Sequence, residues 1–263
     1  MLDLEAADFY KSQGYWLHKK PLFSTEKFDR LQHIFEQILA QKDPTLRSDQ
    51  LDVPHFKYPE LFEFLLADEV LDIVEPILGP NIGLWSSHFV CKEPKIGRAT
   101  PWHEDSSYWN GRMDRMDQIL TVWLAIDHSD RENGCMRVIP GSHSNGFSDY
   151  EDVDIQKNTF GRQVLPSAID ESKAVYFELQ TNESSLHDAR LIHGATANNS
   201  NRRRCGFTMR YFSLESHVLK KRNKNHPVWL CRGQNLGGSI MATLPKELDN
   251  LKGPETMKNK NNI

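Results

Sequence analysis

The sequence predicts an α+β protein, with helices in the first third of the chain and a β-sandwich or barrel core after them. Apolar residues recur at three- and four-residue spacing up to about residue 78, which is the period of amphipathic helices. After Gly79 the pattern changes to short strand-like segments separated by turn-rich pieces. Helices followed by many short strands favour this class of fold.

Three helices are expected before Gly79. The first is short and ends near Gly14. The second begins at Ser24 or Thr25, because either side chain can accept a hydrogen bond from a free N–H group of the first helical turn. The third is expected over residues 59–78, where an apolar stripe runs up to Gly79 and the following proline.

The strands of the core are expected in the remainder of the chain. They are bounded by turn residues and rich in β-branched and aromatic side chains. The expected segments are residues 82–91, 119–126, 136–140, 174–179 and 204–214. The length of 263 residues suits a single domain over residues 1–263, with a polar, flexible tail from about residue 246.

Composition and charge favour some classes of protein and disfavour others. The net charge of −4, with 38% hydrophobic and 26% charged residues, gives no sign of a nucleic-acid or membrane partner. No apolar run approaches the roughly 20 residues that cross a bilayer, and no secretion signal is recognisable. The four cysteines form no CxxC pair, so we expect buried free thiols and a cytoplasmic location. The oligomeric state is not indicated.

The first chemical signal is the His-x-Asp pair of His103 and Asp105. On an extended strand, side chains two residues apart share a face, so both can bind one ion while Glu104 points elsewhere. A second histidine from a distant strand would complete the facial triad of non-haem Fe(II) oxygenases, which leaves positions for a bidentate cosubstrate and O₂. Alone the pair is weak evidence, because a surface histidine and aspartate beside a Pro-Trp turn explain it as well.

His193 is the best candidate for the third ligand, because a short apolar segment leads to it and a turn follows. His187 is the nearest competitor, and a surface or outer-shell position suits it better since Asp188 could cap it. An arginine, Arg204, lies eleven residues beyond His193 and opens the next strand. A hairpin of this length would return its guanidinium to the end of the strand that carries His193, where it could bind a carboxylate bidentately.

Longer stretches of the sequence resemble the phytanoyl-CoA dioxygenase family, a branch of the Fe(II)/2-oxoglutarate oxygenases. They are WHEDSSYW at 102–109, TVWLAIDHSDRENGCMRVIPGSH at 121–143 and HGATANNSNRRRCGFTMRY at 193–211. The lead-in FYKSQGYW and the segment ILGPNIGLWSSHFVCKEP at 77–94 are also similar. The resemblance covers roughly residues 5–215, and the order and spacing of the motifs make it specific.

The resemblance implies a double-stranded β-helix, or jelly-roll, core with flanking helices, and it implies Fe(II), 2-oxoglutarate and O₂ as cofactor and cosubstrates. It maps the iron ligands onto His103, Asp105 and His193, and the clamp for the cosubstrate carboxylate onto Arg204. Four further residues match positions that line the cosubstrate pocket, namely Trp123, Thr121, Ser86 and His88.

Two positions depart from the family pattern, and one agreement is informative. Ala195 stands where relatives often have a serine, and Glu104 stands where they often have a glutamine. Neither change removes a ligand. Halogenating relatives lack the carboxylate ligand, so the presence of Asp105 favours hydroxylation over halogenation.

The predicted function is therefore hydroxylation of a small polar or charged metabolite, with release of succinate and CO₂. The metabolite could be amino-acid-like, an organophosphonate or a natural-product intermediate. Candidate substrate contacts are Glu104, Ser106, Tyr108, Trp109, Asn110, Arg98, Arg112 and Arg162. One alternative is a non-catalytic metal-binding or regulatory protein on the same scaffold. Another is a zinc or manganese hydrolase or isomerase, which would have no need of Arg204.

Overall fold

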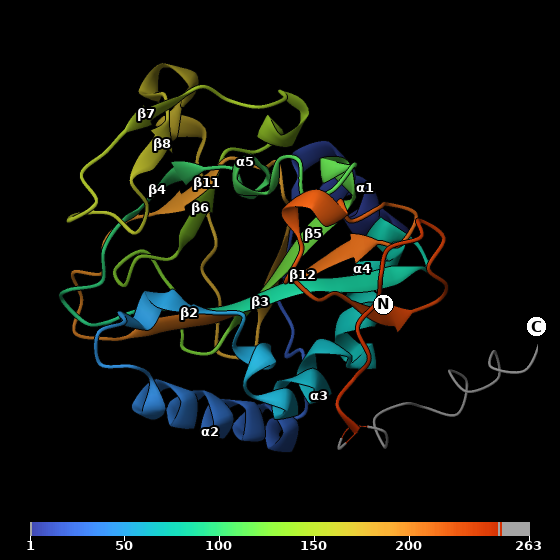
Figure 1. Cartoon of the computed structure of the whole chain (residues 1–263). Coiled ribbons are helices and arrows are strands. Elements are labelled where there is room, and N and C mark those ends of the chain that lie inside the picture. Colours follow the sequence, from blue (N-terminus) through green and yellow to red (C-terminus); the bar gives the residue numbers. More distant parts are fainter. Residues whose placement is uncertain (1, 247, 249–263) are drawn as a thin grey trace, which may run out of the picture.

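The computed structural model describes residues 2–246 and 248. The tail predicted from about residue 246 lies almost wholly outside these residues. Two antiparallel sheets form the core and face one another, and the longer helices cover the outer side of the larger sheet (Figure 1). The α-helices are α1 (Leu4–Gln13), α2 (Thr25–Gln41), α3 (Phe62–Leu65), α4 (Asp68–Leu78) and α5 (Asp105–Trp109).

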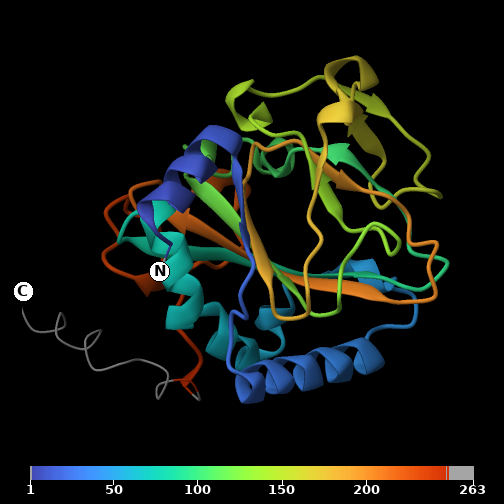
Figure 2. The same cartoon turned by 180° about the vertical axis from the view of Figure 1, so that it is seen from behind.

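The larger sheet, called here the major sheet, has seven strands. In spatial order six of them are β1 (Tyr15–His18), β10 (Ser184–Asp188), β5 (Ile119–Ala125), β12 (Arg204–Ser213), β3 (Ile82–Lys92) and β13 (Trp229–Arg232), and β2 (Leu51–Asp52) also pairs with β3. The pairing of β12 with β3 extends from Arg204 opposite Lys92 to Ser213 opposite Ile82. This long ladder forms the centre of the molecule (Figure 2).

The smaller sheet, called here the minor sheet, is built from much shorter strands. Its order is β4 (Thr100–His103), β11 (His193–Ala195), β6 (Met136–Val138) and β9 (Val175–Tyr176). A separate hairpin of β7 (Tyr150–Asp152) and β8 (Arg162–Val164) packs beside β4. Short 3₁₀ helices connect these elements: η1 (Ser48–Gln50), η2 (Pro54–Phe56), η3 (Pro59–Leu61), η4 (Met116–Gln118), η5 (Ser142–Ser144), η6 (Pro166–Ala168), η7 (Glu171–Lys173) and η8 (Lys220–Arg222).

The outer face of the major sheet forms the main hydrophobic core with the helices. Alternate residues of β12 and β3 point to this side because strand side chains alternate between faces. Phe207 and Phe89 stack there with ring centroids 4.3 Å apart, and Phe35 of α2 lies 4.9 Å from Phe89. All three side chains are fully buried. Burial of this kind supplies the largest favourable contribution to folding.

The opposite face of the same strands is polar. Ser86 of β3, Arg210 of β12, Thr121 of β5 and His187 of β10 are consecutive cross-strand partners and form one row. A second row contains His88, Thr208, Trp123 and Ser185. The inner face of the major sheet is therefore lined by hydrogen-bonding and charged groups that face the minor sheet.

The helix predictions are confirmed in part. The first helix ends at Gly14, whose φ of 81° places it in the left-handed region that favours glycine. The second begins after Ser24, whose Oγ accepts a hydrogen bond from the N–H of Lys27 at 3.3 Å. The prediction of one helix over residues 59–78 is wrong, because Ala67 is extended, with ψ of 134°, and separates α3 from α4.

The strand predictions were best in the major sheet, where β3, β5 and β12 have nearly the expected bounds. The segments expected at residues 136–140 and 174–179 contain the shorter strands β6 and β9. The four cysteines are free, and Cys91, Cys135 and Cys205 are buried as expected. Within the described part of the chain, no helix has both the length and the apolar character needed to cross a membrane.

Candidate metal centre

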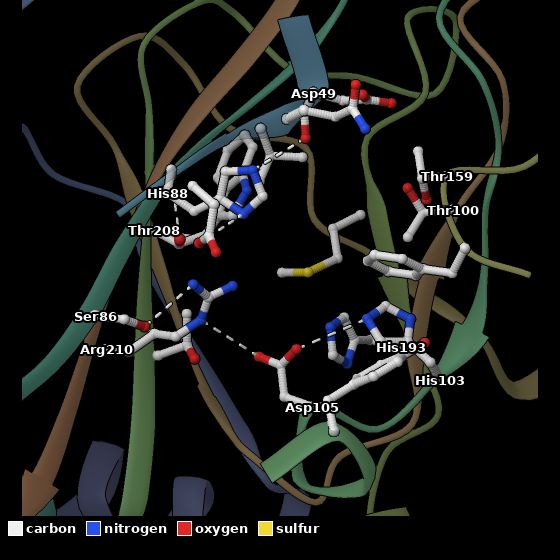
Figure 3. Close-up of a pocket in the computed structure, with 18 of the residues that line it drawn as sticks. Asp49, Ser86, His88, Thr100, His103, Asp105, Thr159, His193, Thr208 and Arg210 are labelled. Carbon is white, nitrogen blue, oxygen red and sulfur yellow. Dashed lines mark hydrogen bonds and ion pairs between the residues drawn. The ribbon is translucent and has the colours of Figure 1, made fainter. Parts of the chain in front are cut away.

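The two sheets enclose a cavity of about 810 Å³. This volume lies in the range of sites that hold small molecules. The major sheet contributes the polar inner face described above, and the minor sheet contributes both imidazoles of the predicted triad. Segments before β3, from Leu46 to Val53, cover part of the rim. Figure 3 shows the side chains converging on this space from both sheets.

His103, Asp105 and His193 lie together in this cavity. One possible ligand atom from each of them lies within 4.8 Å of the others, and all three side chains are buried. His103 ends β4 and His193 begins β11, and the two are direct cross-strand partners with ring centroids 4.1 Å apart. Antiparallel pairing thus brings together two histidines that are 90 residues apart in the sequence.

Asp105 reaches the cluster in a different way from the predicted one. The expectation that both residues of the His-x-Asp pair lie on one strand is wrong, because β4 ends at His103 and Asp105 is the first residue of α5. Glu104 between them is extended, with φ of −115° and ψ of 130°. The change from strand to helix turns the Asp105 carboxylate toward His103, whose Nε2 lies 3.8 Å from Oδ1.

Both histidines are held with the same ring nitrogen facing inward. Nδ1 of His103 lies 2.8 Å from the carbonyl oxygen of Pro101, and Nδ1 of His193 lies 2.8 Å from that of Leu191. A nitrogen in such a contact donates its hydrogen, which leaves Nε2 as the acceptor that can bind a metal. The two imidazoles are therefore oriented for coordination by backbone carbonyl groups.

The protonation states of the cluster also suit a metal ion. Burial, reinforced by neighbouring His193, lowers the pKa of His103 to about 3, so this imidazole is neutral at physiological pH. Burial alone would raise the pKa of Asp105, but the Arg210 guanidinium and the nearby histidines outweigh it and bring the value to about 2. Neutral imidazole and ionised carboxylate are the forms that ligate metals. Two imidazoles and one carboxylate fit the donor set of non-haem Fe(II) sites.

Arg204 lines the same cavity from the first position of β12. It is buried, and its Nε and Nη2 donate to the carbonyl oxygen of Gly134 at 3.0 and 2.7 Å. Its guanidinium lies over the Trp123 ring, 5.2 Å from the centroid. Burial lowers the pKa of this guanidinium from its ordinary value. The preceding arginines point outward, since Arg202 pairs with Asp130 and Glu132, and Arg203 with Asp127 and Glu36.

The other predicted cosubstrate residues lie on the inner face of the major sheet. Thr121, Trp123, Ser86 and His88 all line the cavity. The hydroxyl of Thr121 is buried and has no hydrogen-bond partner among the described residues. His88 is held by a contact of 3.0 Å between Nε2 and the carbonyl oxygen of Asp49. An unpartnered buried hydroxyl facing a cavity is a group that a ligand could satisfy.

The predicted substrate contacts divide into two groups. Tyr108, Trp109 and Arg112 line the cavity. The other five lie outside its lining: Glu104, Ser106, Asn110, Arg98 and Arg162.

Each of the five is engaged or placed elsewhere. The carboxylate of Glu104 accepts a hydrogen bond from Ser148 Oγ at 2.5 Å, and Ser106 is fully buried. Asn110 is exposed at the end of α5, and Arg98 donates to the carbonyl oxygen of Ile155 at 2.9 Å. Arg162 is an exposed residue of β8 and pairs with Asp152. Their directions could not be predicted from the alternation of side chains along a strand, because the strand ends at His103.

Among the lining residues that were not predicted, Arg210 lies beside the triad, and the closeness of His187 to the triad was not foreseen. Arg210 points into the cavity from β12, and the period of two from Arg204 could have shown that both share a face. His187 was expected at the surface or in an outer shell, capped by Asp188. It is buried and lines the cavity with its ring centroid 4.9 Å from that of His193, while Asp188 instead binds Arg190 through both carboxylate oxygens.

Comparison with known proteins agrees with the resemblance seen in the sequence. A family model described as phytanoyl-CoA dioxygenase matches residues 10–206. A Caenorhabditis elegans protein named phytanoyl-CoA dioxygenase domain-containing protein 1 homolog is 26% identical over 250 residues, which cover 83% of this chain and 82% of that protein. A Stutzerimonas stutzeri protein named probable alpha-ketoglutarate-dependent hypophosphite dioxygenase is 26% identical over 187 residues, or 70% of this chain and 63% of that protein.

Solved structures of similar proteins confirm the predicted fold class. The apo structure of ThoJ, described as a non-heme monooxygenase, superposes with a TM-score of 0.73 at 21% identity and covers 92% of this chain and 88% of its own. The structure of EvdO2 from Micromonospora carbonacea var. aurantiaca complexed with 2-oxoglutarate gives a TM-score of 0.68 at 21% identity, covering 81% and 91%.

Proposed function

The chain belongs to the phytanoyl-CoA dioxygenase family, and from this premise we propose that it hydroxylates a small polar or charged metabolite. Membership makes it an iron- and 2-oxoglutarate-dependent dioxygenase. The proposal assigns Fe(II) to His103, Asp105 and His193, and the far carboxylate of 2-oxoglutarate to Arg204. The observation that carries it is the placement of three buried ligand atoms within 4.8 Å in the cavity that Arg204 also lines.

When bound, Fe(II) and 2-oxoglutarate supply oxidation by O₂, in which 2-oxoglutarate becomes succinate and CO₂ and one oxygen atom enters the substrate as hydroxyl. The chain's own part is to bind and orient these groups. Arg204 is fixed by Gly134 and Trp123, so its guanidinium is already ordered before the cosubstrate arrives. The unpartnered hydroxyl of Thr121 can donate to the cosubstrate. Ordering these groups in advance lowers the entropic cost of binding.

One feature supports hydroxylation as the outcome, and a second supports a polar or charged substrate. Asp105 is present and buried beside both imidazoles, so the position that halogenating relatives leave open is filled. The cavity is polar on the major sheet, which suits a substrate with charged or hydrogen-bonding groups. A relative named as a hypophosphite dioxygenase gives a precedent for a small anionic substrate.

Substitution of Arg204 tests the cosubstrate assignment. Arg204→Gln should weaken 2-oxoglutarate binding by about 10- to 100-fold, because a charge-assisted hydrogen bond contributes roughly 1.5–3 kcal/mol. Metal binding should be retained, since Arg204 contacts none of the three proposed ligands in the described structure. Calorimetric titration of 2-oxoglutarate into the Mn(II)-loaded variant measures the first effect, and titration of Mn(II) measures the second.

The matched control is Arg202→Gln, two residues earlier, where the side chain pairs with Asp130 and Glu132 outside the cavity. It should leave cosubstrate affinity unchanged. Succinate formation and O₂ uptake with Fe(II) and a panel of metabolites test the reaction itself. Equal 2-oxoglutarate affinity in both variants would refute the clamp assignment, and zinc-dependent turnover without 2-oxoglutarate would refute the oxygenase. Iron binding without turnover on any substrate would favour the non-catalytic alternative.

Three further assignments belong to the same proposal. The chain acts as one domain, because both sheets contribute to a single cavity. It acts on a small molecule and has no nucleic-acid partner, in keeping with the net charge of −4. Its location is cytoplasmic, which the free cysteines favour and which cell fractionation would test.

A further inference from the structure

The cavity has a second group of cations, separate from Arg204. Arg210 points into the space from β12 and its side chain is only 12% exposed (Figure 3). Nη1 lies 3.4 Å from Ser86 Oγ, and Nε lies 3.8 Å from Asp105 Oδ2, which is an ion-pair distance but too long for a hydrogen bond. Nε is buried and has no hydrogen-bond partner among the residues that the structure describes.

Arg112 approaches the same part of the cavity from the segment after α5. Its guanidinium lies over the Trp85 ring at 4.8 Å from the centroid, and its Nε donates to Asn223 Oδ1 at 2.8 Å. Arg210 lies in the same way over Trp109, at 5.3 Å. The two tryptophan rings are 6.3 Å apart in an edge-to-face arrangement. Arg112, Arg210, Trp85 and Trp109 are together called here the Arg–Trp pocket, and all four line the cavity.

The charges of the cavity do not balance without an anion at this pocket. With the cofactors bound as proposed above, the charges of Fe(II), Asp105, the 2-oxoglutarate dianion and Arg204 cancel. Arg47 and Asp49 form an ion pair at 2.9 Å and cancel as well. Among the charged residues that line the cavity, this leaves the guanidinium groups of Arg112 and Arg210 and the carboxylate of Asp52. The Asp52 side chain is 66% exposed.

Desolvation makes this excess positive charge unfavourable. Burial lowers the pKa of Arg112 from its ordinary value, which shows that nearby carboxylates do not offset the loss of water around it. The unpartnered Nε of Arg210 is a further cost, because a buried donor without an acceptor destabilises the folded protein. A bound oxyanion would neutralise the excess charge and accept hydrogen bonds from both guanidinium groups.

We propose that the substrate carries an oxyanion, a carboxylate or a phosphonate, which binds to Arg210 and Arg112 beside Trp85 and Trp109. The proposal rests on the function proposed above and names the class of its substrate. Arg210 lies beside Asp105, so the carbon that is hydroxylated lies within a few bonds of the oxyanion. Both indole rings also line the cavity, so they allow an apolar or planar group next to that anion.

The test uses the full chain with saturating Mn(II) and 2-oxoglutarate, so that the cosubstrate fills its own site and no oxidation occurs. The probes are phenylacetate and phenylphosphonate, and 2-phenylethanol is the uncharged counterpart. Binding is measured by calorimetry and by tryptophan fluorescence, because two of the six tryptophans lie in the Arg–Trp pocket. We expect one of the anionic probes to bind at least about tenfold more tightly than the alcohol.

Arg112→Gln should weaken binding of that probe at least about tenfold while 2-oxoglutarate affinity changes less than about twofold. Arg210→Gln should weaken it as much, and Arg210→Lys should restore part of the loss because it keeps the positive charge. Arg115→Gln is the matched control, since Arg115 is exposed three residues away and pairs with Asp117. Arg112 does not contact Asp105, so its variant tests the pocket even if changes at Arg210 disturb the metal site.

The outcomes separate this inference from the proposed function. If 2-oxoglutarate binds in an Arg204-dependent manner but neither anion binds better than the alcohol, the inference is overturned and the proposed function stands. If the probes bind only when 2-oxoglutarate is absent, they occupy the cosubstrate site and the inference is again overturned. If 2-oxoglutarate does not bind to the Mn(II)-loaded protein at all, the proposed function itself has failed.

Discussion

The two sheets that enclose the cavity are stabilised in different ways. In the major sheet, β3 and β12 pair over ten positions, and their outer face is buried under helices. In the minor sheet the longest strand, β4, has four residues and β11 has three. The major sheet carries Arg204, Arg210 and Trp123, and the minor sheet with the adjoining α5 carries the proposed metal ligands. The proposed carboxylate clamp and the proposed metal site thus lie on sheets whose strands differ greatly in length.

The minor sheet relies on local contacts rather than on a long ladder. Trp102 packs with Val164 and Ile192 in a small cluster, and its Nε1 donates to Glu171 at 2.9 Å. Arg137 lies over the same tryptophan at 4.3 Å and pairs with Glu171 at 2.7 Å. Small clusters bury little apolar area, so a bound ion should add much of the stability of this sheet. The comparison therefore predicts that a substitution can lower metal affinity without lowering the stability of the metal-free protein, and the reverse.

The largest effect should follow removal of a ligand from the minor sheet. His193→Ala should weaken metal binding by more than about 100-fold, because changes to mere partners of metal ligands already cost 10–100-fold. Turnover should be lost with the metal. The midpoint of thermal unfolding without metal should shift by no more than about 2–4 °C, the change expected for about 1 kcal/mol in a domain of this size.

Calorimetry with Mn(II) and thermal unfolding followed by circular dichroism measure these two effects. The control is His128→Ala, because His128 is a partly exposed histidine that pairs with Asp130 outside the cavity. Metal affinity should be unchanged in the control. A collapse of metal-free stability in His193→Ala would contradict the division of roles between the two sheets.

A smaller effect on binding and a larger one on stability should follow a change inside the major sheet. A Cβ atom added at Gly206 would lie 2.0 Å from Cζ2 of Trp123, so the indole would have to move. Gly206→Ala should destabilise the protein by about 1–3 kcal/mol, the usual cost of overpacking. It should also weaken 2-oxoglutarate binding by about tenfold, because Trp123 supports the Arg204 guanidinium through a cation–π contact.

Chemical denaturation and calorimetry on the Mn(II)-loaded protein measure the two effects. Gly161→Ala is the matched control, since the nearest atom to its added Cβ would be Ile155 Cδ1 at 3.9 Å. Metal affinity should survive in both variants. Unchanged cosubstrate affinity in Gly206→Ala would show that Trp123 does not position Arg204.

The same contrast explains how much of the fold could be predicted from the sequence. β3, β5 and β12 carry apolar residues on their buried outer face, so the apolar pattern of a strand could be recognised in the sequence. β10 was missed although it is hydrogen-bonded to strands on both sides, because Leu186 is the one large apolar residue among its five. In the minor sheet, β6 and β9 lie within longer predicted segments, because strands of two to four residues are too short for periodicity to give their bounds.

The site was predictable where chemistry and spacing coincide. The His-x-Asp pair and the eleven-residue offset to Arg204 pointed to residues that the structure brings into one cavity. Arg210 was not singled out, although its even spacing from Arg204 along β12 places both side chains on the inner face of the major sheet. The substrate contacts were hardest to predict, since the turns after β4 direct Glu104 and Asn110 away from the cavity.

The smallest effect concerns the outer side of the major sheet, away from the proposed metal site. His55 of η2 is buried, and its Nδ1 lies 2.6 Å from Ser87 Oγ on the face of β3 opposite to Ser86. Burial, with a contribution from His226, lowers the pKa of His55 to about 3. The folded protein thus keeps this imidazole neutral, whereas the unfolded chain binds a proton below about pH 6.5. Stability from this group is therefore complete above pH 6.5 and is lost as the pH falls toward 3.

His55→Gln should remove this contribution and reduce the slope of unfolding free energy against pH by up to about 1.4 kcal/mol per pH unit between roughly pH 6 and 4. Urea denaturation of the metal-free protein across this range measures the slope. Ser87→Ala is the matched control, because it removes the hydrogen-bond partner but keeps the titrating imidazole, so stability should fall while the slope remains. An unchanged slope in His55→Gln would show that acid destabilises the protein through other groups, such as the histidines of the cavity. The pH sensitivity of the protein would then arise on the inner side of the major sheet.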